Sequence, residues 1–310
     1  MTIRISEVGP RDGLQSIAAI ISTHQKCRWI DALADAGLTE IEVGSFVPKD
    51  LFPQLADTAE IVEHARRRSN LCVVALTPNL RGAKDALHAG VHKVTIPVSA
   101  SVAHSRANLR KSPDDMVKEV RIICESVSNH NSQPKSGRVS VEVGISTAFG
   151  CTIEGPVPED RVIRLAKACA DAGADSVGLS DTTGMANPTQ IGRLFGRLRS
   201  ELGDKSGAAH LHNTRGLGLA NALAAYEVGV DTFDSSLAGL GGCPYAPGAS
   251  GNIVTEDLVY MFEAMGVRTG VSFEGLLQAR RILSECLPDE PLYGMTPLAG
   301  LPKGFSGTAR

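Results

Sequence analysis

Short β-like runs alternate with amphipathic helical patterns along most of this chain, and the alternation restricts its fold more than any other feature. The two patterns can be told apart because side chains alternate across a strand but repeat every 3.6 residues in a helix. Eight strands in such an alternation predict an α/β fold, a (β/α)8 TIM barrel with a C-terminal helical extension. An open doubly wound sheet is the alternative, but no Gly-rich dinucleotide fingerprint follows the first run.

The expected elements follow directly from these patterns. The predicted strands are 3–8, 39–43, 71–76, 93–97, 139–145, 176–179, 209–212 and 231–235. The predicted helices are 23–36, 57–68, 80–89, 112–127, 159–172, 188–202 and 217–228. A glycine follows several of these helices, which suits the left-handed residue that ends a helix: Gly37, Gly90, Gly173 and Gly229.

The length and composition favour one large domain. With 310 residues, 43% of them hydrophobic, the chain can bury a large core. We expect a barrel domain over residues 1–287, including helical residues 255–287 that cap or extend it, and a Gly/Pro-rich tail over residues 288–310. Residues 129–137 are polar and predict a loop that leads from a helix into the fifth strand.

The charge pattern excludes several classes of function. The net charge is −3 and no basic stripe is present, so no nucleic-acid partner is expected. No apolar run approaches the roughly 18 residues that a membrane span requires. No leader pattern precedes the first strand, which favours a cytoplasmic protein. The seven cysteines contain no Cys-x-x-Cys pair and predict reduced thiols, of which only Cys243 lies in a Gly/Pro-rich loop.

Polar residues recur where each predicted strand ends. In a TIM barrel the active site lies at the carboxyl ends of the strands. Polar residues scattered at random would not fall at the end of one predicted strand after another. This pattern is the strongest argument from the residues alone for an enzyme. The residues concerned are Arg11, Asp12, Glu42, Thr77, Asn79, Ser99, Ser101, His104, Ser146, Thr147, Asp181, Thr182, Thr183, His210, His212, Asn213, Ser235 and Ser236.

The segment His210-Leu211-His212 predicts a metal site. Residues two apart in a strand point the same way, so both imidazoles are aimed at one point. With the carboxylate of Asp12 and the amide oxygen of Asn252 they form a mixed nitrogen and oxygen set, which favours Mg²⁺ or Mn²⁺ over a structural zinc. The alternatives are ordinary core or surface histidines, and a turn role for Asp12 within Arg-Asp-Gly.

Arg11 and Cys243 are candidate catalytic residues. Arg11 either pairs with Glu42 or Asp181 at the barrel mouth or holds a positive charge over a developing oxyanion, and an ion pair that orients it allows both. Cys243 lies among glycines that permit hinge motion and close backbone approach, and its thiol can exchange protons near neutral pH if its surroundings lower its pKa. The alternative is an inert loop cysteine.

Several segments together resemble the 3-hydroxy-3-methylglutaryl-CoA lyase family of metal-dependent barrel lyases. The glycine loop that contains Cys-Pro-Tyr-Ala is the most specific of them, because Claisen-type synthases share the Arg-Asp and His-x-His elements but not this loop. The resemblance covers essentially residues 1–275. The segments are 9–15 (GPRDGLQ), 42–47 (EVGSFV), 76–80 (LTPNL), 180–184 (SDTTG), 210–212 (HLH) and 239–252.

The resemblance implies a role for each residue. Asp12, His210, His212 and Asn252 would bind the divalent cation, Arg11 would stabilise the enolate of the thioester, and Cys243 would be a general acid/base on a lid. Glu42 and Asp181 would support this network, and Gln15 and Thr182 would line the substrate site. The reaction would be a retro-aldol cleavage of an acyl-CoA, and family analogy suggests a homodimer.

The chain departs from the family at positions that line or neighbour the acyl and CoA site. The family's Asn-Glu-Lys after Gln15 is here 16–18 (SIA), its Arg-Gly-Tyr is 142–144 (EVG), and its Asp-Thr-Tyr after His212 is 213–215 (NTR). The acyl group is therefore open, with 3-hydroxy-3-methylglutaryl-CoA and citramalyl-CoA as rival substrates. Three basic residues are candidates for contacts with CoA phosphates, or are solvated loop charges: Arg106, Arg110 and Lys111.

Two other functions remain as alternatives. A Claisen-type acyltransferase that joins acetyl-CoA to a 2-oxo acid would use the same Arg11-Asp12 and His210/His212 elements. Such enzymes often carry a further regulatory domain, for which 310 residues leave little room. A binding protein with a decayed barrel site would explain the substitutions in the pocket.

Overall fold

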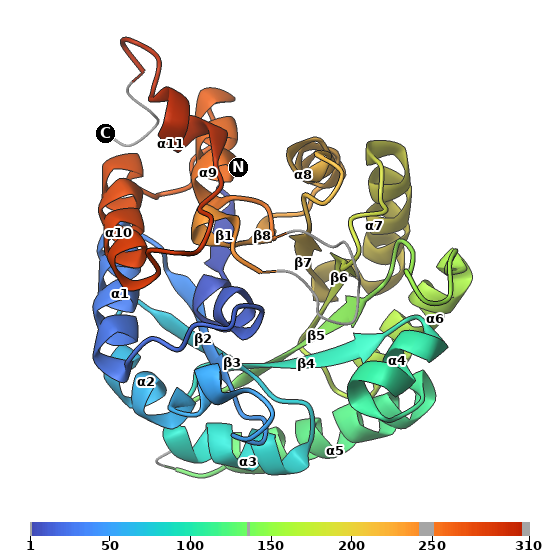
Figure 1. Cartoon of the computed structure of the whole chain (residues 1–310). Helices are drawn as coiled ribbons and strands as arrows, with labels where there is room; N and C mark the ends of the chain where they lie inside the picture. Colours follow the sequence, from blue (N-terminus) through green and yellow to red (C-terminus); the bar gives the residue numbers. More distant parts are fainter. Residues whose placement is uncertain (1, 135–136, 242–250, 306–310) are drawn as a thin grey trace.

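The protein is a closed barrel of eight parallel strands in sequence order, and the predicted fold is confirmed (Figure 1). The computed structural model describes residues 2–134, 137–241 and 251–305. The strands are β1 (Arg4–Glu7), β2 (Glu40–Ser45), β3 (Cys72–Leu76), β4 (Lys93–Ser99), β5 (Ser140–Ser146), β6 (Ser176–Asp181), β7 (Ser206–Leu211) and β8 (Thr232–Ser235). β8 pairs in parallel with β1 and closes the sheet.

A ring of helices surrounds the barrel; of the C-terminal helices, α10 lies beside α1, α9 lies beside β1, and α11 packs against α9 (Figure 1). The helices are α1 (Thr23–Asp35), α2 (Thr58–Ala65), α3 (Leu80–Ala89), α4 (Val102–Leu109), α5 (Pro113–Asn131), α6 (Glu159–Asp171), α7 (Pro188–Leu202), α8 (Gly218–Glu227), α9 (Thr255–Ala264), α10 (Phe273–Cys286) and α11 (Met295–Ala299). Short helical segments are η1 (Gly9–Gly13), η2 (Pro53–Leu55), η3 (Gly203–Lys205) and η4 (Leu237–Gly239).

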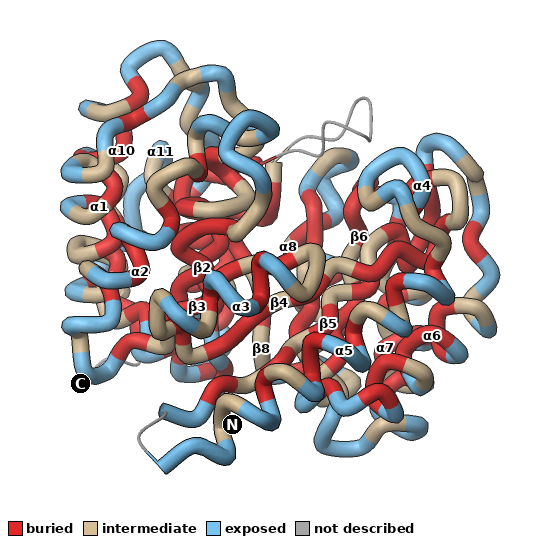
Figure 2. Tube along the Cα trace, turned by 90° about the horizontal axis from the view of Figure 1, so that it is seen from below, coloured by how far each residue is buried: buried red, intermediate tan, exposed pale blue. Residues whose placement is uncertain are grey.

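The core lies between the strands and the inner faces of the helices, whose outer faces are exposed (Figure 2). β5 shows how this follows from the sequence. Val141, Val143 and Ile145 are buried, whereas Glu142 and Gly144 are only half-buried and line the barrel interior. The alternation therefore separates an apolar outer layer under the helices from a polar inner surface.

Local signals in the sequence set the helix ends. The side chains of Asn79, Ser112 and Asn187 each accept a hydrogen bond from a backbone N–H in the first turn of α3, α5 and α7. Such caps satisfy donors that have no partner within the helix. The predicted helix-ending glycines all have positive φ angles: Gly37 (100°), Gly90 (88°), Gly173 (112°) and Gly229 (92°).

Residues 255–287 are helical as expected and form α9 and α10, whereas three other elements differ from the expected ones. Helix α5 extends to Asn131 and so shortens the predicted loop. Helix α4 was not predicted, because Val102–Leu109 lacks an apolar stripe. The tail carries the short helix α11. Nowhere in the described ranges is a helix both long and apolar enough to cross a membrane.

Candidate active site

A cavity of about 740 Å³ opens at the carboxyl ends of the strands and reaches into the barrel. Every strand contributes to its wall, and the loops that follow β1, β2 and β4 extend it outward. Part of the polar set predicted at the strand ends lines this cavity, and the rest is absent from its described wall; the members that line it are Arg11, Asp12, Glu42, Asn79, His104, Ser146, Thr182, His210 and His212. Strand residues in the wall include Ser6, Glu42, Leu76, Thr95, Gly144, Ser180, His210 and Asp234.

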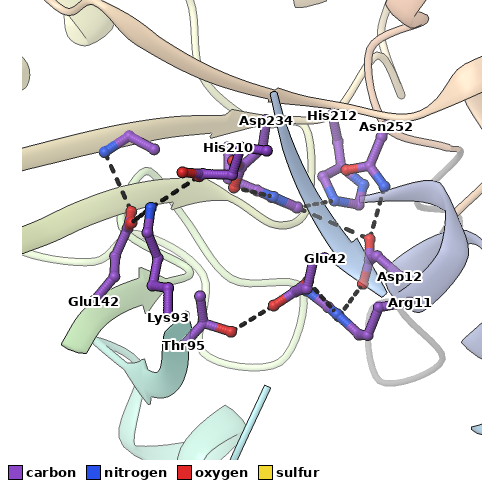
Figure 3. Close-up of polar contacts among 12 residues, drawn as sticks. Arg11, Asp12, Glu42, Lys93, Thr95, Glu142, His210, His212, Asp234 and Asn252 are labelled. Carbon is purple, nitrogen blue, oxygen red and sulfur yellow. Dashed lines mark hydrogen bonds and ion pairs between the residues drawn. The ribbon is translucent and has the colours of Figure 1, made fainter. Parts of the chain in front are cut away.

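Asp12, His210 and His212 lie together at this cavity, with one ligand atom from each within 4.8 Å of the others. The two imidazole Nε2 atoms are 3.2 Å apart, and Nε2 of His210 is 3.9 Å from Asp12 Oδ2 (Figure 3). The geometry is that expected of two imidazoles at the end of β7 and a carboxylate from the loop after β1. Among the described residues, this cluster has the composition of a cation site.

Asn252 completes the cluster. It pairs with His212 in an isolated β-bridge, and its Nδ2 donates to Asp12 Oδ2 at 2.7 Å. Its buried Oδ1 has no hydrogen-bond partner among the described residues. An unpartnered buried amide oxygen is costly unless a ligand satisfies it, so the residues fit a divalent cation with nitrogen and oxygen ligands.

Asp12 is positioned by an unusual helix. Residues Gly9–Gly13 form a single turn of π-helix, η1, in which the backbone N–H of Asp12 donates to Val8 O at 2.7 Å. Such turns are rare and are found frequently at functional sites. Gly241 packs against this turn from the other side: a Cβ there would lie 2.5 Å from Asn252 Nδ2 and 3.1 Å from Asp12 Oδ2. Only glycine allows this approach at its φ of 109°.

Arg11 is held by two carboxylates at the edge of the cluster. Its Nε donates to Glu42 Oε2 and its Nη1 to Asp12 Oδ1, both at 2.5 Å (Figure 3). Of the two predicted partners, Glu42 forms the ion pair with Arg11. Thr95 on β4 donates to the other oxygen of Glu42, a contact that the sequence did not reveal. Arg11 is thus fixed beside the cation site.

Asp234 is a site residue that sequence reasoning missed. Its Oδ2 lies 3.0 Å from His210 Nδ1, so it orients the ring whose other nitrogen faces Asp12 and His212. This arrangement of carboxylate, histidine and cation ligand is common in metal sites and sets the histidine tautomer. The only signal in the sequence was an acidic residue at an inward position of the short strand β8.

The electrostatics keep Asp12 ionised and His210 easily protonated. Burial acts to raise the pKa of Asp12, but the nearby Arg11 and His210 outweigh it and lower that pKa to about 2. Burial likewise opposes protonation of His210, but the hydrogen bond to Asp234 and its charge raise its pKa. Burial raises the pKa of Glu42, and Arg11 offsets this only in part. Asp12 is therefore ionised, as a cation ligand must be, and a bound cation would compete with the proton on His210.

Of the other predicted residues, two line the cavity and one is buried next to it. Gln15 and Thr182 line the cavity, and Thr182 Oγ1 accepts the backbone N–H of Thr147 at 2.8 Å. Asp181 is buried, is absent from the described cavity wall and accepts the backbone N–H groups of Met185 and Ala186. Burial raises the pKa of Asp181 to about 6 against these hydrogen bonds.

Cys243 and the three basic residues that follow β4 are the last of the predicted residues. Cys243 lies outside the described residues, and the six cysteines within them are free. Arg110 and Lys111 line the outer end of the cavity, whereas Arg106 is not part of its described wall. Lys111 pairs with Glu119, and Arg110 makes no ion pair with a described residue. This outer end can therefore contact an anionic group.

The cluster and its neighbours can bind a hydroxyl or carboxylate oxygen through a cation and place Arg11 over a developing negative charge. Comparison with known proteins agrees with this chemistry. The chain is 39% identical over 91% of its length to the hydroxymethylglutaryl-CoA lyase YngG of Bacillus subtilis, of which it covers 92%. It is 38% identical over 92% of its length to the human mitochondrial hydroxymethylglutaryl-CoA lyase, of which it covers 86%.

The fold comparison gives the same result. The structure of an HMG-CoA lyase from Acinetobacter baumannii in complex with coenzyme A and 3-methylmalate matches with a TM-score of 0.90 and 38% identity. The match covers 98% of this chain and 96% of that one. The HMGL-like family model matches residues 2–283. The predicted class, a carbon–carbon lyase, is therefore confirmed, and the chain belongs to the HMGL-like family of hydroxymethylglutaryl-CoA lyases.

Proposed function

We propose that this protein is a divalent-cation-dependent lyase that cleaves 3-hydroxy-3-methylglutaryl-CoA, or a close analogue such as citramalyl-CoA, by a retro-aldol reaction. The products would be acetyl-CoA and acetoacetate, or acetyl-CoA and pyruvate. The observation that carries the proposal is the convergence of Asp12, His210 and His212 beside Arg11 at the inner part of the cavity. The cation is proposed to be Mg²⁺ or Mn²⁺.

Four residues are proposed to bind the cation: Asp12, His210, His212 and Asn252. When bound, the cation would supply Lewis acidity that lowers the pKa of the substrate's tertiary hydroxyl. Asp234 keeps Nε2 of His210 directed at the cluster by binding its Nδ1. Asp12 contributes a permanent negative charge because its pKa is about 2.

Arg11 is proposed to stabilise the enolate oxygen that forms when the C2–C3 bond breaks. Its two ion pairs fix the guanidinium before the reaction, so little reorganisation is needed as charge develops. We assign the proton transfers, from the hydroxyl and to the enolate carbon, to the thiol of Cys243 as general acid/base. Asp181 is proposed to support the loop that carries Thr182, and Gln15 and Thr182 to contact the acyl group.

The outer end of the cavity is proposed to bind coenzyme A. Arg110 and Lys111 lie there together with the apolar Pro48, Leu51 and Phe52, a combination that suits phosphates and an adenine ring. We further propose a cytoplasmic homodimer, as family analogy suggests. Residues 1–287 are proposed as the catalytic domain and 288–310 as a tail.

The test is detection of both products by mass spectrometry from the two thioesters, with Mg²⁺, Mn²⁺ or EDTA. We expect acetyl-CoA with either ion and none with EDTA. The variants Asp12→Ala, His210→Ala and Cys243→Ser should each lose at least about 100-fold in kcat. His24→Ala, which changes an exposed histidine outside the cavity wall, is the matched control and should retain activity.

Activity that survives EDTA and Cys243→Ser would contradict the mechanism. Release of free CoA from acetyl-CoA plus a 2-oxo acid would instead identify a Claisen-type acyltransferase. Binding of acyl-CoA without turnover of any thioester would identify a binding protein.

A further inference from the structure

Gly144 is a glycine that neither the backbone nor the packing requires. It lies in the middle of β5 on the side that lines the cavity, and its φ angle is not positive. A Cβ built on it would have no heavy atom of a described residue within 4 Å, apart from its chain neighbours. Other strand glycines differ, because a Cβ would lie 2.4 Å from Thr58 at Gly44 and 2.5 Å from Ala208 at Gly178.

A glycine in a strand costs stability, because it has no side chain to pack and more freedom to lose. Inward positions of TIM barrels are normally filled by bulky branched side chains. The empty position at Gly144 thus leaves part of the barrel interior unfilled without a compensating contact from the protein. Close approach of a ligand is the other known reason for such a glycine.

The position of Gly144 indicates which part of a substrate would lie there. β5 is four strands from β1 in either direction around the closed barrel, so Gly144 is across the interior from the loop that carries Asp12. Gly144 is in register with Pro97 on β4, and Val74 and Leu76 on β3 continue the same wall. An aliphatic group would find apolar contacts on this side.

A carboxylate would not be favoured at Gly144. Glu142 precedes it by one inward position on the same strand, and Glu40 lines the same inner end of the cavity. These two carboxylates share Lys93, at 2.8 Å from Glu40 and 3.0 Å from Glu142, so Lys93 is already paired twice and does not offer its charge to a third carboxylate. The substrate's own carboxylate would therefore remain on the cation side.

We propose that Gly144 determines substrate specificity by providing space for an alkyl group larger than methyl on the 3-hydroxyacyl chain. This inference rests on the proposed function and specifies its substrate class. The polar end of the substrate binds at the cation cluster, and the alkyl substituent extends toward β3, β4 and β5.

The experiment compares kcat/KM for 3-hydroxy-3-alkylglutaryl-CoA thioesters with methyl, ethyl, propyl and butyl substituents. We expect the wild-type protein to cleave the butyl thioester within about tenfold of the methyl one. In Gly144→Val, the butyl value should fall at least about tenfold relative to the methyl value, since one extra methylene in an apolar pocket changes kcat/KM by roughly 10–200-fold. Gly144→Ala should show a smaller change in the same direction.

Stability separates a steric role from a folding defect. Gly144→Ala and Gly144→Val should keep or raise the melting temperature, because the position is open and valine favours strands. Gly196→Ala is the matched control: it fills another open glycine, on α7 and outside the described cavity wall, and should leave the selectivity unchanged.

A butyl-to-methyl ratio that is unchanged in Gly144→Val would overturn the inference, and so would a wild-type protein that cleaves only the methyl thioester. In both cases the proposed function would stand. If the wild-type protein cleaves no thioester of the series with Mg²⁺ or Mn²⁺, the proposed function fails and the inference fails with it.

Discussion

Asp234 shows how one residue outside the cation cluster can control it. Its carboxylate binds Nδ1 of His210 and so leaves Nε2 directed at Asp12 and His212. Loss of such a partner commonly lowers metal affinity or activity by 10–100-fold. The residue is half-buried at the cavity wall, so a substitution leaves the apolar core intact.

We therefore expect Asp234→Ala to weaken Mn²⁺ binding by about 10–100-fold and Asp234→Asn to restore much of it, since the amide oxygen can still accept from Nδ1. Isothermal titration with Mn²⁺ measures both variants. His92→Ala changes a histidine outside the cavity wall and serves as a comparison. Equal affinities in the alanine variant and the wild-type protein would contradict an orienting role.

The residues of the cation cluster could be predicted from the sequence because they lie in recognisable short motifs. His210-Leu211-His212 and Arg11-Asp12 each place two functional groups by local geometry alone. Asp234 and Thr95 could not be predicted in the same way. Each is a single polar residue in a strand, and its role depends on which neighbour the barrel brings to it.

At the scale of elements, Glu7 joins the end of β1 to the turn after β8. It accepts the backbone N–H groups of Gly9 and Leu237 at 2.9 Å and the hydroxyl of Thr255 at 2.7 Å. It therefore holds η1, which carries Arg11 and Asp12, against η4. Burial raises the pKa of Glu7 to about 8 despite these hydrogen bonds.

This pKa predicts a pH dependence of stability. The folded-state pKa of Glu7 exceeds its ordinary value of 4.5, so its contribution is complete below that value and is lost as the pH rises to about 8. Between pH 5 and 8 (the approximate window) the free energy of unfolding should fall by at most about 1.4 kcal/mol per pH unit from this one group. Denaturant unfolding at several pH values measures it.

Glu7→Gln is the test variant, because glutamine is similar in shape to the protonated acid and can still accept from Gly9 and Leu237. We expect its stability to depend less on pH than that of the wild-type protein, and the difference between them to grow toward pH 8. Parallel pH profiles for the two proteins would show that Glu7 does not titrate in this range.

Helices with a strong hydrophobic periodicity could be predicted from the sequence, and segments without it could not. The helices α1 to α3 and α5 to α8 appear in the sequence as apolar stripes, whereas α4 has none and was missed. The turn η1 was interpreted as a loop because Asp12-Gly13 is a common turn pair. Its π-helical form includes the bond from the Leu14 N–H to Gly9 O, five residues apart, which forms only in the folded chain.

For the whole molecule, cation binding and folding should be coupled. The ligands come from three distant parts of the chain: the loop after β1, the end of β7 and residue 252. A cation that binds only when these parts are assembled stabilises the folded state by about 2.7 kcal/mol at 100 times its Kd. We expect Mn²⁺ to raise the melting temperature by several degrees, and EDTA to reverse the shift.

Asp12→Asn is the matched variant for this measurement, because it keeps the shape of the side chain but removes its charge. Its melting temperature should respond to Mn²⁺ only at much higher concentration. A wild-type melting temperature that is indifferent to Mn²⁺ and Mg²⁺ would argue against the cation site.

Leu240 and Asn252, twelve residues apart in the chain, meet beside the cation ligands. Asn252 Nδ2 binds both Leu240 O, at 3.2 Å, and Asp12, so the two ends of segment 241–251 are fastened beside the cation ligands. Cys243 is not among the proposed cation ligands, so we expect Cys243→Ser to lower turnover and to leave the affinity for the ion as it was.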